Sequence, residues 1–327
     1  MPPTDVTRRR FIAVSAAFAA AAAWPRSGSA ATDLLEWRGV ALGAAASIRL
    51  AHPDRAEGRR VLQRCVDEIA RLERIFSLFR PDSDLCRLNR DGVLDLPPLE
   101  LVELLSYAAS VSAATGGTFD VTVQPLWRRY ADHFAASDAD PAGPAVDDLL
   151  PLVDWRGIAV AADRIALRRP GMAVTLNGIA QGYITDRVAE LLRSAGLDSV
   201  LIDLGETRAL GAHPDGRPWR VGLADPSAPG RIALRLDLSD GALATSGGYG
   251  TVFDPSGRHT HLLDPRSGLS APVRRSVSVL APRAATADAA STALALLPVG
   301  EVSDVLRRLG ARAAHILGPE GVSLVRA

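Results

Sequence analysis

The chain has 327 residues, of which 47% are hydrophobic and 23% charged, and these proportions exclude an intrinsically disordered protein. Its 37 basic and 37 acidic residues cancel, so the net charge gives no reason to expect binding to nucleic acid or to an anionic membrane surface. All the basic residues are arginines, so any cationic side chain at a site would be a planar guanidinium.

The first 30 residues have the pattern of a signal peptide, which leaves residues 31–327 as the folded part. Arg8, Arg9 and Arg10 precede an apolar stretch over residues 11–23, and small residues suited to cleavage follow it. The stretch is shorter than the ~20 apolar residues of a membrane span, so we expect no membrane anchor in the mature protein. The paired arginines favour a twin-arginine signal, with an ordinary secretory signal as the alternative, and we expect a periplasmic protein.

The mature chain is predicted to alternate strands and helices in an irregular order. Residues 34–50 indicate a pair of strands, and residues 138–144 a surface loop. Apolar residues at helical spacing predict helices over residues 59–76, 98–115, 179–194, 284–297 and 302–309. Short apolar runs predict strands at residues 157–160, 174–176, 200–204, 219–223, 232–238, 276–280 and 313–317. This order does not fit a doubly wound sheet, so we predict one α+β unit of two lobes.

Two cysteines, Cys65 and Cys86, would share an oxidising compartment. A disulfide between them is one possibility. Because Cys65 lies on the apolar face of the predicted helix over residues 59–76, we favour a buried free thiol.

Residues 175–186 are one of several segments that concentrate glycine, acidic residues and hydroxyls. They lead a predicted strand into a helix through Asn177 and Gly178, and the free N–H groups at such a helix start suit a phosphate. The segment is neither a Walker A loop nor a G-x-G-x-x-G fingerprint. The other segments are residues 76–89, 116–126, 244–249, 261–268 and 287–292.

Asp288 and Thr292 stand four residues apart on a predicted helix, so their oxygens face the same side. Oxygen donors on one face suit a hard cation such as Mg²⁺, which needs few protein ligands when a phosphate supplies others. Each piece also has a structural interpretation: Asn177 or Asp288 could cap a helix, and Thr292 could be a core hydroxyl. Together they predict a metal–pyrophosphate site.

Five motifs in this order resemble those of the ApbE family, the FAD:protein FMN transferases. They are Gly-Thr-Phe-Asp at 117–120, Asn-Gly-Ile-Ala-x-Gly-Tyr-x-x-Asp at 177–186, Ala-Thr-Ser-Gly-x-Tyr at 244–249, His-x-x-Asp-Pro-Arg-Ser-Gly at 261–268 and Ala-Asp-Ala-x-x-Thr at 287–292. The resemblance extends from about Trp37 to the C-terminus. It implies a mixed α/β fold with two lobes around a flavin-binding cleft, and Mg²⁺ on the pyrophosphate of FAD.

The implied reaction moves FMN from FAD to a threonine or serine hydroxyl of a partner protein and releases AMP. Motif position makes Asp288 and Thr292 side-chain metal ligands and Gly178 a backbone carbonyl ligand. His261 becomes the candidate general base or phosphate contact, with a structural histidine as the alternative. The residues implied to contact the flavin nucleotide are Leu42, Phe79, Thr118, Phe119, Asp120, Thr175, Gln181 and Leu263. Asp264 and Arg266 are expected to shape a turn.

Three positions depart from the family pattern: Thr175 stands for an aspartate, Gln181 for a lysine and Leu42 for a methionine. Gln181 can donate hydrogen bonds but cannot neutralise charge, so weaker FAD binding or altered activity follows as an expectation. A non-catalytic FAD-binding carrier and a pyrophosphatase that releases FMN and AMP are therefore the alternatives.

The acceptor implied by the resemblance is a flavoprotein, in particular a membrane redox subunit. The export signal fits the NosX-type branch, which serves NosR, while subunits of Nqr or Rnf type are equally compatible.

Overall fold

An eight-stranded sheet, in which every neighbouring pair is antiparallel, forms the framework of the protein. The computed structural model describes residues 34–327 apart from 226–227, 229, 271–275 and 319–320, so the predicted signal peptide lies outside the described residues. In spatial order the strands are β1 (Leu35–Ala41), β2 (Ala44–Leu50), β6 (Val200–Asp203), β7 (Thr207–Leu210), β10 (Gly241–Gly247), β11 (Ser276–Ala281), β12 (Ala313–Gly318) and β13 (Gly321–Arg326).

Smaller sheets and the helices surround this framework. One small sheet joins β3 (Val93–Asp95), β5 (Arg164–Leu167) and β4 (Ile158–Val160), and another joins β8 (Trp219–Ala224) and β9 (Ile232–Leu238). The helices are α2 (Arg55–Phe76), α3 (Asp84–Asp91), α4 (Leu99–Ala114), α5 (Gln124–Ala135), α6 (Ala180–Ser194), α7 (Ala284–Leu294) and α8 (Val302–Leu309). The α+β prediction is therefore confirmed.

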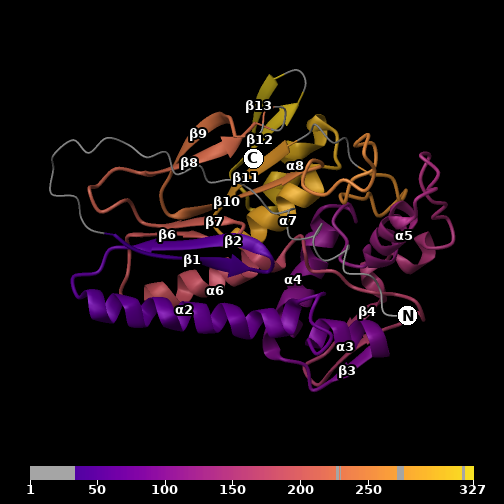
Figure 1. Cartoon of the computed structure of the whole chain (residues 1–327), viewed down its shortest axis with the longest axis horizontal. Coiled ribbons are helices and arrows are strands. Elements are labelled where there is room, and N and C mark those ends of the chain that lie inside the picture. The colour runs from indigo at the N-terminus through magenta and orange to yellow at the C-terminus, as the bar shows by residue number, and fades with distance from the viewer. Residues whose placement is uncertain (1–33, 226–227, 229, 271–275, 319–320) are drawn as a thin grey trace.

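Helices α2 and α6 lie along one face of the large sheet, with α6 between α2 and the strands (Figure 1). Asp54 caps α2 by accepting hydrogen bonds from the backbone N–H groups of Ala56 and Glu57. Apolar residues at intervals of three and four then place one buried stripe along the whole helix. The periodicity that predicted α2 is thus the pattern of its packing.

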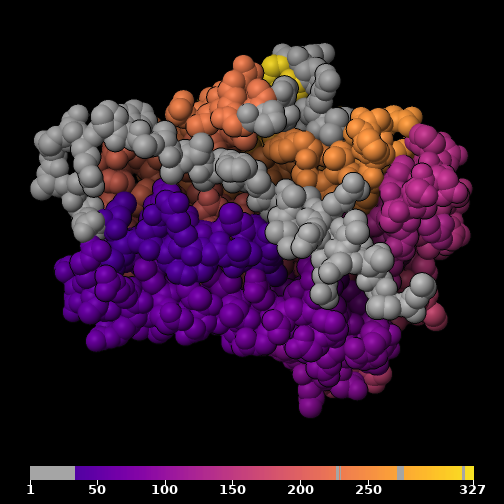
Figure 2. Space-filling view, in the orientation of Figure 1, coloured from indigo at the N-terminus to yellow at the C-terminus, as the bar shows by residue number. Residues whose placement is uncertain are grey.

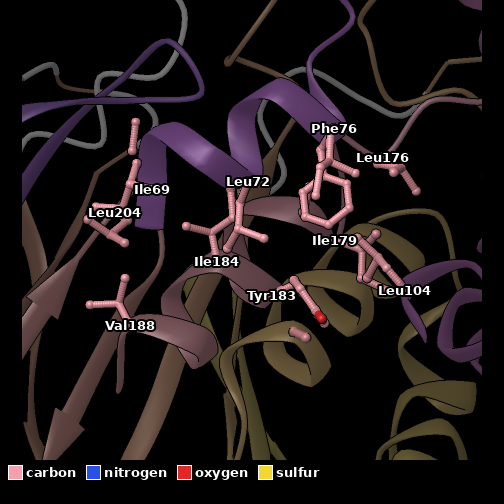
Figure 3. Close-up of a cluster of buried hydrophobic side chains, with 14 of the residues drawn as sticks. Ile69, Leu72, Phe76, Leu104, Leu176, Ile179, Tyr183, Ile184, Val188 and Leu204 are labelled. Carbon is pink, nitrogen blue, oxygen red and sulfur yellow. The ribbon is translucent and has the colours of Figure 1, made fainter. Parts of the chain in front are cut away.

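The main core forms where α2 and α6 meet (Figure 3). Leu72 of α2 and Ile184 of α6 are almost completely buried there, and the rings of Phe76 and Tyr183 pack edge to face with centroids 5.6 Å apart. Each fully buried side chain of this size contributes about 1.5–3 kcal/mol relative to an exposed one. This packing holds the first turn of α6 in a fixed position.

A second core lies between α7, α8 and strands β10 to β12, and a smaller one lies under α5. In the smaller core Leu126 and Tyr130 of α5 pack with Val146 and Leu263. Figure 2 shows α5 at the end of the molecule away from the long part of α2, beside the segment of residues 249–268.

Two helices and five strands were not predicted from the sequence, and one predicted strand is absent from the described structure. The run over residues 174–176 is buried but is not a strand, because Asn89 bonds both backbone groups of Val174 and the N–H of Thr175 donates to the Val121 carbonyl. Helices α3 and α5 were not expected. Five strands were not expected either: β3, β5, β7, β10 and β13.

The cysteines remain thiols. Cys65 is completely buried and Cys86 is partly exposed, and neither forms a disulfide. Burial raises the pKa of the Cys65 thiol to about 12, so the prediction of a buried free thiol is confirmed. No helix in the described part of the chain is long and apolar enough to cross a membrane.

Candidate functional site

The first turn of α6 lies close to the backbone at the start of α7 and is hydrogen-bonded to a side chain in the middle of α7. The N–H of Gly182 donates to a carboxylate oxygen of Asp288 at 3.0 Å. A Cβ on Gly182 would lie 2.4 Å from the carbonyl oxygen of Ala284, so only glycine allows this approach. Asp288 is therefore directed at α6 and does not cap its own helix, whose N-cap is Arg283.

Gly178 and Thr292 lie beside this contact. A Cβ on Gly178 would be 2.9 Å from the hydroxyl of Thr292, and that hydroxyl lies 3.3 Å from the hydroxyl of Ser246 on β10. Asn177 does not cap α6, because the N-cap is Ile179, whose side chain makes no capping bond. The structure thus brings together Gly178, Asp288 and Thr292, the three residues predicted as metal ligands.

Asp288 is 3% exposed, and burial raises its pKa to about 7. The bond from Gly182 opposes this shift only in part. Among the described residues, no group of three or more histidine, cysteine, aspartate or glutamate side chains could hold a metal ion by itself. A cation at Asp288 would therefore need hydroxyl, carbonyl and phosphate oxygens, which is the usual situation for Mg²⁺.

Asp186, the last residue of the α6 motif, fixes where α7 begins. Its carboxylate accepts hydrogen bonds from the backbone N–H groups of Ala284 at 2.8 Å and Ala285 at 3.1 Å. Two arginines, Arg208 and Arg283, pair with the same carboxylate, which is 1% exposed. Asp186 therefore acts as a cap for α7 supplied from α6.

The loop after α4 brings a second group of predicted residues to the same place. Thr118 is buried and its hydroxyl has no hydrogen-bond partner within the described residues. The ring of Phe119 lies 3.4 Å from where a Gly178 Cβ would be. Asp120 uses both carboxylate oxygens inside the protein: one bonds the hydroxyl of Thr122, and the other accepts from the N–H of Trp155 at 2.9 Å. Asp120 therefore shapes this loop.

The remaining predicted flavin residues are spread more widely. Leu42 forms the β1–β2 turn with a φ of +46°, and Phe79 is 62% exposed after α2. Thr175 accepts a hydrogen bond from the N–H of Asn177, while Leu263 is 4% exposed and packs in the core under α5.

Gln181, on the first turn of α6, lies over the turn between β6 and β7. A Cβ on Gly205 would be 2.4 Å from the side-chain nitrogen of Gln181.

His261 lies between two isolated bridges and not in a strand. Its Nδ1 lies 3.1 Å from both the backbone nitrogen and the carbonyl oxygen of Thr251. Burial lowers the pKa of its imidazole, which favours the neutral ring. His259 has a structural contact instead, 3.2 Å from the Pro141 carbonyl. Asp264 and Arg266 pair within a tight turn, as predicted.

Sequence reasoning missed Glu206, in the turn between β6 and β7. This side chain is 7% exposed, and one of its carboxylate oxygens has no hydrogen-bond partner among the described residues. An acidic residue directly after Gly205 at a strand end was the only signal in the sequence.

The residues present fit both a divalent cation and a dinucleotide. A buried carboxylate, a hydroxyl and a backbone carbonyl are oxygen donors of the kind that Mg²⁺ takes. The unpartnered hydroxyl of Thr118 gives the ligand a buried hydrogen-bonding group that the protein itself leaves unused.

The fold and this junction define an α+β protein whose polar site lies where two helices meet above an antiparallel sheet. The model of the ApbE family matches residues 42–316. This chain therefore belongs to the ApbE family.

Curated relatives and a solved structure agree with this assignment. The FAD:protein FMN transferase of Treponema pallidum is 31% identical over 292 residues, which cover 81% of this chain and 79% of that protein. The FAD:protein FMN transferase of Haemophilus influenzae is 29% identical over 253 residues, which cover 71% of each chain. The crystal structure of the Pseudomonas stutzeri flavinyl transferase ApbE, apo form, aligns with a TM-score of 0.73 at 26% identity and covers 90% of this chain and 94% of that one.

Proposed function

We propose that this protein is a Mg²⁺-dependent FAD:protein FMN transferase that moves FMN from FAD to a threonine or serine hydroxyl of a partner protein and releases AMP. The observation that carries the proposal is the meeting of Gly178, Asp288 and Thr292 where α6 contacts α7. The names of the curated relatives support the same chemistry.

Asp288 and Thr292 would hold the cation through their side-chain oxygens, and Gly178 through its carbonyl. Bound there, Mg²⁺ would neutralise charge that develops on the leaving phosphate. The positive end of the α6 dipole would favour the pyrophosphate beside it. The N–H groups of Ala180 and Gly182 are already bonded to the Leu176 carbonyl and to Asp288.

His261 would act as the general base that takes the proton from the acceptor hydroxyl. The hydroxyl oxygen of the partner forms a bond to the phosphorus of the FMN half, and the bond from that phosphorus to the bridging oxygen breaks. AMP leaves with the bridging oxygen, and the hydroxyl proton passes to the imidazole. A neutral ring whose Nδ1–H donates to the Thr251 carbonyl at 3.1 Å leaves its Nε2 free to accept that proton.

The flavin nucleotide would contact Thr118 and Phe119, with Asp120 holding their loop in shape. Leu42, Phe79 and Leu263 would supply apolar contacts. Thr175 and Gln181 would lie towards the phosphates, where neither contributes a charge.

We also propose that the protein works in the periplasm after export by a twin-arginine signal. Its partner would be a membrane redox subunit of NosR, Nqr or Rnf type that carries the acceptor hydroxyl. The pattern of residues 1–30 supports this location.

A product assay tests the function. The purified mature protein is incubated with FAD, Mg²⁺ and the purified flavin-accepting subunit of an Nqr-type complex, and the products are separated by chromatography. Covalent FMN on the subunit together with AMP supports the proposal. Free FMN with AMP would make the protein a pyrophosphatase, and bound FAD without AMP would make it a carrier; the neutral Thr175 and Gln181 motivate both alternatives.

A further inference from the structure

Glu206 is buried in a place where no cationic side chain of the described residues balances its charge. One carboxylate oxygen accepts a hydrogen bond from the backbone N–H of Thr245, and the other has no partner among the described residues. The charged groups that act on Glu206 are Asp288 and Asp203, both acidic, and no arginine of the described chain is among them. A buried carboxylate without a cation is costly, because it has lost water and gained no counter-charge.

Two separate paths connect Glu206 to the proposed cation ligands. Its neighbour Gly205 lies against Gln181, which directly precedes the Gly182 that bonds Asp288. On the other side, Thr245 is followed by Ser246, whose hydroxyl bonds Ser291 at 2.7 Å and lies 3.3 Å from Thr292. Glu206 therefore lies near the junction of α6, α7 and β10, close enough to Asp288 for the two charges to act on each other.

We propose that Glu206 is the second carboxylate of the divalent-cation site, and that its unpartnered oxygen attracts the cation to the place set by Asp288 and Thr292. This inference rests on the metal site of the proposed function and adds a residue that the motifs did not indicate. Two carboxylates with hydroxyl and carbonyl oxygens form a donor set for Mg²⁺ or Mn²⁺. Gln181, whose side chain lies against Gly205, is neutral and so adds no counter-charge next to Glu206.

Metal binding without FAD tests the role of Glu206 directly. The free Mn²⁺ signal in electron paramagnetic resonance is measured during titration of the mature protein, of Glu206→Gln and of Asp288→Asn. Glu206→Gln keeps the shape of the side chain and removes only its charge, and we expect its affinity for Mn²⁺ to fall by about 10–100-fold. Asp288→Asn should abolish binding.

Asp203→Asn is the matched control. It removes an equal charge close to Glu206, but the Asp203 carboxylate already accepts a hydrogen bond from the N–H of Gly205. We expect this variant to keep its Mn²⁺ affinity within about threefold. The melting temperature of metal-free Glu206→Gln should equal or exceed that of the unmodified protein, because an unbalanced buried acid has been removed.

The outcomes separate this inference from the proposed function. Wild-type Mn²⁺ affinity in Glu206→Gln, with binding lost in Asp288→Asn, would overturn the role of Glu206 and leave the transferase proposal intact. No Mn²⁺ binding by the unmodified protein would also overturn it. Equal losses in Glu206→Gln and Asp203→Asn would show a general effect of negative charge and contradict a specific ligand.

Discussion

Gly182→Ala tests whether the contact between α6 and α7 is as tight as the structure indicates. The added methyl group would lie 2.4 Å from the carbonyl oxygen of Ala284 and 2.7 Å from the Cα of Ala285, whereas ordinary contacts begin at 3.4 Å. Both obstacles are backbone atoms, so no side chain can rotate away, and the two helices must separate by roughly 1 Å.

The expected cost combines overpacking with the loss of one buried hydrogen bond. Overpacking a core typically costs about 1–3 kcal/mol, and separating the helices also weakens the bond from Gly182 to Asp288. We expect a loss of about 2–3 kcal/mol, which for a protein of this size lowers the melting temperature by roughly 5–10 °C.

Thermal unfolding followed by circular dichroism measures this loss. Gly300→Ala is the control, because that glycine also has no unusual φ and nothing lies within 4 Å of its added Cβ. The control should melt at the wild-type temperature. If Gly182→Ala did so too, the close approach of the two helices would be refuted.

Four further predictions concern other parts of the molecule. Burial lowers the pKa of His261 from its usual 6.5, so the rate of FMN transfer should fall only as the pH drops through an apparent pKa below 6.5. His261→Gln should remove this pH dependence. An unchanged pH profile in the variant would exclude His261 as the base. The same shift means that the folded protein holds the neutral ring, so its stability should fall as the pH drops below 6.5. Asp186→Asn should lower the free energy of unfolding by about 3 kcal/mol in urea titrations, because it leaves the buried Arg208 without its partner. Asp91→Asn, at an exposed pair, should leave the free energy of unfolding almost unchanged. Iodoacetamide should modify Cys86 in the native protein and Cys65 only after unfolding; rapid labelling of both thiols would contradict the burial of Cys65.

Much of the fold could be predicted because local patterns and packing agree. Helix α2 carries its apolar stripe over six turns, and the strand pair around Gly43 has the small and β-branched residues of a hairpin. The run over residues 174–176 misled the prediction because burial, and not strand pairing, selects its apolar residues. Its backbone is bonded by the side chain of Asn89, which is 85 positions away in sequence from Val174.

The candidate site, like the fold, could be predicted only where the pattern is local in the sequence. The spacing of Asp288 and Thr292 revealed one face of α7, since that relation is local to a helix. Glu206 could not be recognised in this way, because its burial and its missing partner depend on the contacts of β7 with β10 and of Gly205 with Gln181. Phosphate-binding and metal-binding residues on one helix can thus be predicted from sequence, while a charge brought to them by a distant turn cannot.

Flavin transfer through the junction of α6 and α7 is tested most directly by the intact mass of the acceptor. The accepting subunit of an Nqr-type complex is incubated with FAD, Mg²⁺ and either the unmodified protein or Asp288→Ala, and its mass is then measured. The unmodified protein should add one FMN to the acceptor, and Asp288→Ala should add none. An acceptor left without FMN by the unmodified protein would contradict the proposed function. An acceptor modified equally by both proteins would contradict the metal site.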